Sequence, residues 1–103
     1  MSRVTFGGKH ASEIRQEVFD FTSRLAVGET ISNAVVTATV YSGTDAAPSA
    51  LIRGSATISG AQVKQVLMAG VLGVTYLLTC AATTSTLQEL RLTAFMTIIP
   101  DHL

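Results

Sequence analysis

The sequence predicts an all-β fold, and three observations indicate it. Two runs, residues 74–82 and 87–99, alternate apolar and polar side chains with a period of two. Turn-forming Gly, Asp, Ser and Pro separate the apolar runs at short intervals. Threonine, which packs well on a half-exposed sheet, is abundant. About seven short strands spaced in this way are typical of an immunoglobulin-like antiparallel β-sandwich, with a small barrel as the alternative.

The chain should divide into an extended N-terminal arm, residues 1–12, and a sandwich, residues 13–103. The arm lies outside any regular alternation, carries Phe6 as a candidate anchor and has Gly7 and Gly8 as a hinge. The sequence is compatible with two arrangements of this arm. The arm frays, or it lies along a neighbouring subunit and adds backbone hydrogen bonds at a strand edge or places Phe6 in a pocket.

The first strands follow the arm. Residues 11–16 could form one helical turn that nothing sustains, and residues 17–22 then alternate as a strand with Phe19 and Phe21 on its inward face. Gly28 is a candidate structural residue, because it turns the chain toward a second long strand over residues 31–41. The adjacent Val35 and Val36 break the alternation of that strand and predict a bulge.

The middle of the chain reads as turns and a hairpin. The segment YSGTDAAPSA, residues 41–50, has turn chemistry, and a short strand is expected at residues 50–53. Residues 55–58 and 62–68 should then pair as a hairpin, with Ser59 and Gly60 at the turn.

The C-terminal runs give the strongest local signal. Tyr76 and Cys80 lie on the apolar face of the first run, and a face of Leu, Ala, Met and Ile extends along the second. The polar segment TTST, residues 83–86, is short enough to join the two as an antiparallel hairpin, and Pro100 ends the last strand. Tyr76 is a second candidate structural residue. Its hydroxyl forms a tyrosine corner with upstream backbone, or the ring is an ordinary inward aromatic.

Composition excludes several partners. The charges of the seven basic and seven acidic residues cancel, so no net electrostatic field attracts nucleic acid or anionic lipid. Residues 66–82 carry no charge, but their two glycines and their period of two argue against a membrane helix. The first ten residues lack the apolar run of a secretory signal, so we expect synthesis inside the cell.

Reactive chemistry is sparse, and we predict no enzyme activity, no catalytic residue, no cofactor and no metal. Cys80 is the only cysteine, which excludes an intrachain disulfide and favours a buried apolar role. His10 and His102 lie near the termini, where a solvated side chain is the usual outcome. The acidic residues Glu13, Glu17 and Asp20 are close in sequence, but a strand directs Glu17 and Asp20 to opposite faces, which disfavours an acid/base pair.

The chain from about Lys9 to Pro100 resembles a family of small proteins from tailed-bacteriophage structural modules, called fiber-tail adaptor or tail-associated proteins. The resemblance is carried by the segments FDFTSRLAVGETIS, residues 19–32, and VYSGTD to CAATTS, residues 40–85. Its marks are Asp20, Phe21, Gly28, Glu29, Thr30, Asp45, Ser59, Gly60 and the stretch Gly73–Tyr76. Relatives often have a glycine in the hairpin corresponding to Thr83–Leu87, and this chain has none.

The resemblance implies a non-enzymatic virion structural protein that is assembled in the host cytoplasm. We expect it to repeat in symmetric copies as a fiber-tail or neck/tail adaptor, in contact with other copies of itself and with other phage structural proteins, but not with nucleic acid or membrane. A capsid decoration or cement protein is the alternative in the same class. A receptor- or carbohydrate-binding module is the alternative of another class. It is disfavoured because the chain has no Trp and only two Tyr to form stacking platforms.

Overall fold

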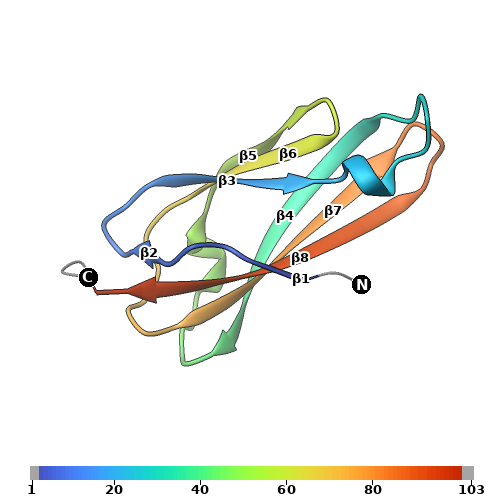
Figure 1. Ribbon diagram of the computed structural model, residues 1–103. Coiled ribbons are helices and arrows are strands. Elements are labelled where there is room, and N and C mark those ends of the chain that lie inside the picture. The colour runs from blue at the N-terminus through green and yellow to red at the C-terminus, as the bar shows by residue number, and fades with distance from the viewer. Residues whose placement is uncertain (1–2, 101–103) are drawn as a thin grey trace.

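The computed structural model describes residues 3–100, which form two facing β-sheets (Figure 1). The larger sheet has the order β1 (Arg3–Thr5), β8 (Glu89–Ile99), β7 (Thr75–Thr84) and β4 (Ile31–Ser42), and β2 (Lys9–His10) also pairs with β8. The smaller sheet has the order β3 (Arg15–Asp20), β6 (Gln62–Leu67) and β5 (Ile52–Ser59). The helical segments within residues 3–100 are two short 3-10 turns, η1 (Thr22–Arg24) and η2 (Pro48–Leu51). The all-β sandwich is therefore confirmed, whereas its immunoglobulin-like classification stays a prediction.

One hydrophobic core lies between the sheets. Strands β7 and β8 pair in antiparallel register from Thr75 with Thr97 to Thr83 with Glu89, as the sequence predicts. Alternate residues of both strands point into the core, and burying each large aliphatic side chain stabilises the fold by about 1.5–3 kcal/mol. These residues are Tyr76, Leu78, Cys80 and Ala82 from β7 and Leu92, Ala94, Met96 and Ile98 from β8.

The predicted strand at residues 17–22 corresponds to β3, which begins two residues earlier and ends at Asp20, with Thr22 already in η1. Phe19 and Phe21 are both buried, so the predicted inward face is correct. Strand β6 pairs with β3 on one side and with β5 on the other, and the β5–β6 hairpin turns between Ser59 and Gln62 as expected.

Two details of the predicted strands are wrong. Strand β4 has no bulge at Val35 and Val36, because its register with β7 is regular there and shifts only near its two ends. Val35 simply faces solvent and Val36 faces the core. The separate strand predicted at residues 50–53 does not form either. Ala50 lies in η2, and Ile52 begins the single strand β5, which is interrupted between Arg53 and Thr57.

The connection between β3 and β4 carries the chain from the smaller sheet to the larger one. It contains η1 and then Gly28, whose φ of 80° lies in the left-handed region that glycine adopts without strain. A turn, not a helix, occupies residues 11–12 in the segment where a helical turn was considered. None of the helical segments in residues 3–100 is long and apolar enough to cross a membrane.

Candidate assembly surfaces

The N-terminal arm forms an edge of the larger sheet. Its backbone runs parallel to β8, with Arg3 opposite Thr93 in β1 and Lys9 opposite Ile98 in β2. From Thr5 to Lys9 the arm advances four residues while β8 advances three, from Phe95 to Ile98. One extra residue therefore bulges out of the ladder in the segment that contains Gly7 and Gly8.

Phe6 anchors this bulge. Its N–H donates to the carbonyl oxygen of Phe95 at 2.9 Å, and its ring packs edge-on against Phe19 with the centroids 5.3 Å apart. Gly8 permits a close approach, because a Cβ atom there would lie 3.0 Å from the side chain of Ile99. Phe6, Gly7 and Gly8 thus contact their own chain. Their predicted contact with a neighbouring subunit stays a prediction, as does the division of the chain at residue 12.

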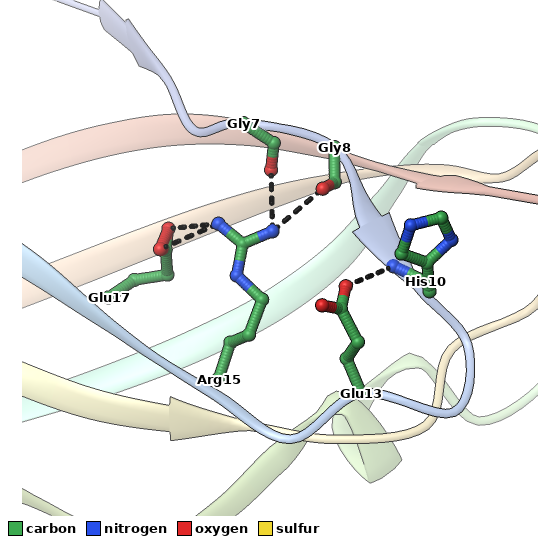
Figure 2. A network of polar contacts seen from close by, with 6 residues as sticks. All are labelled: Gly7, Gly8, His10, Glu13, Arg15 and Glu17. Carbon is green, nitrogen blue, oxygen red and sulfur yellow. Dashed lines mark hydrogen bonds and ion pairs between the residues drawn. The ribbon is translucent and has the colours of Figure 1, made fainter. Parts of the chain in front are cut away.

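Two cations hold the arm in place, one of them shown in Figure 2. The Arg15 guanidinium on β3 donates to the carbonyl oxygens of Gly7 at 3.3 Å and Gly8 at 2.7 Å, and it pairs with Glu17 at 3.1 Å. Lys9 is fully buried, and its Nζ donates to the carbonyl oxygens of His10 at 2.9 Å and Ala69 at 2.7 Å. The arm is therefore bonded both to β3 and to the loop after β6.

A buried carboxylate, that of Glu29, lies in the connection that contains Gly28. Glu29 accepts hydrogen bonds from the hydroxyl of Thr84 at 2.5 Å, from the hydroxyl of Thr86 and from the N–H of Ala26 at 2.9 Å. These bonds lower the pKa of Glu29, the bond from Thr84 most strongly. The loop before β4 is in this way fixed to the β7–β8 hairpin at one end of the sandwich.

Tyr76 performs a similar function at the other end. Its hydroxyl accepts a hydrogen bond from the N–H of Val71, five residues upstream, at 2.9 Å and donates to Asp45 at 2.6 Å. Burial, and then the bond to Asp45, raise the pKa of Tyr76, and the same bond lowers the pKa of Asp45. As in a tyrosine corner, the phenol bonds to backbone a few residues upstream, and it also bonds to a carboxylate. These bonds join the loop after β4 to the loop before β7.

Several of these structural residues were not identified from the sequence. Glu29 and Asp45 stand among the marks of the family resemblance, but their partners are distant in sequence, and periodicity carries no information about them. Lys9 gave no signal, because a lysine near a terminus is usually exposed. Arg15 was likewise missed, since the carbonyl groups it binds belong to the arm, which had no predicted position.

The outer face of the larger sheet is broad and mostly uncharged. Cross-strand rows run through β4, β7 and β8, and one row joins Thr37, Thr79 and Thr93 while the next joins Thr39, Leu77 and Phe95. Tyr41 packs edge-on against Phe95 with the centroids 4.6 Å apart, yet 62% of Tyr41 is exposed. A sheet face of hydroxyl, methyl and aromatic groups is suited to contact with protein.

The side chains considered above as possible reactive groups make local contacts within the fold. Each of the three carboxylates accepts hydrogen bonds from its own neighbours: Glu13 from the His10 N–H, Glu17 from Arg15, and Asp20 from the N–H and hydroxyl of Thr22. Burial raises the pKa of Cys80 to about 12, which keeps its thiol protonated. His102 lies outside the described residues.

Two pockets and the titratable side chains of the described residues bear on small ligands and metals. Within residues 3–100, no group of three or more His, Cys, Asp or Glu side chains could hold a metal ion. The pockets beside Phe6 and beside Val35 have volumes of about 260 and 210 Å³. Both are smaller than the roughly 300–1,000 Å³ that is usual for small-molecule sites.

Comparison with known proteins gives one clear similarity. Residues 9–97 match the family described as podophage GP4 fiber-tail adaptor protein gp77. The match runs from the start of β2 to two residues before the end of β8, and so includes every strand of the two sheets except β1. No curated protein matches the chain.

Proposed function

Since the chain belongs to the family of the podophage GP4 fiber-tail adaptor protein gp77, we propose that it is a non-enzymatic adaptor that joins a fiber to the phage tail. The protein is a tail structural component of the virion. The observation that carries the proposal is the family match over residues 9–97, because it includes the strands that form the core. Function within a common sandwich fold depends on its surfaces, and here those surfaces suit protein partners.

The adaptor acts in several symmetric copies. A chain with extents of 44 × 21 × 21 Å has a limited area for each contact with a large virion component. Repetition around a symmetric tail lets weak contacts add by avidity. The uncharged outer face of the larger sheet, with Tyr41 and Phe95, is the first surface that we assign to such contacts.

The N-terminal arm is the second contact in this proposal. Strand β1 forms the outer edge of the larger sheet, so a neighbouring protein can meet its backbone. Removal of residues 1–5 deletes β1 while Phe6, Lys9 and their contacts remain. Light scattering of the truncated protein should then report weaker assembly than the full chain, and unchanged assembly would remove the arm from the proposal.

The function is tested by producing phage particles without this protein. We expect heads and tails to assemble and fibers to be missing, which electron microscopy would show directly. Supplying the protein from a plasmid should restore the fibers. Particles that lack the protein but keep a full set of fibers would contradict the adaptor function.

Quantitative mass spectrometry of purified virions gives an independent test of location. An adaptor should be present in proportion to the tail proteins. A capsid decoration protein would instead follow the copy number of the major shell protein, and that result would favour the alternative.

A further inference from the structure

Strand β4 is an unusual sheet edge. It ends the order of the larger sheet, and within residues 3–100 no strand pairs with its outer side. The strand is twelve residues long, ISNAVVTATVYS, and contains no charged residue, no proline and no glycine. Natural proteins usually interrupt or charge such edges to prevent pairing with another chain.

The other sheet edges have the protection that β4 lacks. Strand β3 carries the charged residues Arg15, Glu17 and Asp20, and Arg15 covers its edge by binding the arm. Strand β5 carries Arg53, and its pairing with β6 is interrupted between Arg53 and Thr57. The arm presents only the short strands β1 and β2. Strand β4 is therefore the longest edge without a charge or an interruption, and its neighbour on that side is the interrupted part of β5, which lines a small pocket together with Ala34–Val36.

The register shows which backbone groups of β4 are available. The N–H of Ile98 donates to the carbonyl oxygen of Val74, and the carbonyl oxygen of Ile98 accepts from the N–H of Gly73, so both backbone groups of Ile98 point toward β7. Backbone groups alternate in direction along antiparallel strands, and the even-numbered residues of β7 therefore bond to β8 while the odd-numbered ones bond to β4. The N–H and C=O groups of Ala34, Val36, Ala38 and Val40 consequently point to the open side of β4.

We propose that β4 pairs in antiparallel orientation with β4 of a second copy, across a twofold axis at Thr37. This register places Val36 opposite Ala38 and Ala34 opposite Val40, so the residues with open backbone groups exchange hydrogen bonds. Thr37 lies opposite itself, and Val35 lies opposite Thr39, as a β-branched pair on the outer face. No like charges meet, because the strand has none.

The same pairing covers side chains that the single chain leaves exposed. Val35 is 53% exposed and Tyr41 is 62% exposed, and both lie on the outer face of β4. In the dimer, Tyr41 lies opposite Asn33 of the second copy and next to its Val35, which buries apolar area of both. The proposal rests on the proposed function, because it names the surface by which the adaptor associates with itself.

Charge reversal tests the pairing in the purified full-length protein. Light scattering across a concentration series should give a mass of twice the 10.8 kDa chain, or an even multiple of it. Thr37→Lys and Thr37→Glu each place like charges opposite each other, so each variant alone should lose this pairing, and an equimolar mixture should restore it. Thr79→Lys is the matched control. It adds the same charge one strand further in, where the two lysines would lie about 14 Å apart, and it should leave the mass unchanged.

A cysteine at the axis tests the register itself. Thr37→Cys should form an intermolecular disulfide under mild oxidation, since residues opposite in a non-hydrogen-bonded pair lie about 4.5 Å apart between Cα atoms. Thr79→Cys should form none. The native Cys80 does not interfere, because it is buried and its thiol stays protonated.

A monomer at every concentration, or a dimer that Thr37→Lys does not weaken, would overturn the pairing. These results are independent of the adaptor function. A monomeric protein whose absence still removes fibers from particles would leave that function standing, and a β4-paired dimer found outside the tail would contradict the function and not the pairing.

Discussion

Glu29 is the residue on which the connection before β4 depends. Its carboxylate accepts bonds from Thr84, Thr86 and Ala26, and these bonds lower its pKa. A carboxyl group with a lowered folded-state pKa adds stability above its unfolded pKa, and that stability is lost as the pH falls through the folded value. We expect Glu29→Gln to unfold at a lower temperature than the native protein at neutral pH.

Acidic pH provides the control for this prediction. Below about pH 4 the native protein should lose the contribution of Glu29, so the difference in melting temperature between native and Glu29→Gln proteins should shrink. Circular dichroism melts from neutral to acidic pH measure both. A difference that stays constant across this range would show that the Glu29 charge has no part in the stability.

The Tyr76 hydroxyl is a second test at the level of one residue. Tyr76→Phe keeps the buried ring but leaves the Val71 N–H without its acceptor and the Oδ2 atom of Asp45 without its donor. We expect a loss of about 1–3 kcal/mol in the free energy of unfolding, measured by urea denaturation. Asp45→Asn, which keeps an acceptor for the phenol, should cost less. An unchanged midpoint for Tyr76→Phe would contradict a structural role for the hydroxyl.

Cys80 should be inert in the folded protein. It is buried, and burial raises its pKa to about 12, so almost no thiolate exists at neutral pH. A thiol reagent should therefore modify the chain only in denaturant. Rapid labelling under native conditions would mean that the core opens near β7.

At the scale of elements, the β7–β8 hairpin has a strained turn. Leu87 adopts a φ of 64°, a conformation that costs a branched residue about 1 kcal/mol or more, and its side chain is 86% exposed. Leu87→Gly should therefore stabilise the protein by up to about 1 kcal/mol in urea denaturation, whereas Leu87→Ala should not. Equal stability of the two variants would contradict strain at this turn.

The sequence predicts the strands whose burial is one-sided. In β7 and β8, alternate side chains enter the core. The sequence of these strands therefore alternates between apolar and polar residues, and this period of two predicts them directly. The polar connections then predict which strands form hairpins. Strand β3 was predicted for the same reason, from Phe19 and Phe21.

Other elements leave no such pattern. Strands β1 and β2 have only three and two residues, so their parallel pairing with β8 produces no periodicity. The neighbouring valines of β4 suggested a bulge, although Val35 is merely an apolar residue on the outer face. The proposed pairing of β4 with a second copy would account for the exposure of Val35. The contacts of Lys9, Glu29 and Asp45 depend on tertiary placement, which a local pattern cannot contain.

At the scale of the whole molecule, polar bonds hold the loops and the arm of residues 3–100 to the two sheets. Its two ends are fixed by buried or partly buried polar bonds around Glu29 and Tyr76, and its arm is fixed by Lys9 and Arg15. Such a molecule presents its sheet faces and edges without first ordering them, which lowers the entropic cost of binding. These properties suit the adaptor family to which the chain belongs.

The central claim is that this chain connects fiber and tail, and a cryo-electron microscopy map of the intact virion tests it most directly. The two-sheet sandwich, 44 Å in its longest extent, should fit density between the fiber and the tail in several symmetric copies. Density for the chain on the surface of the head, with none at the fiber attachment, would contradict the account.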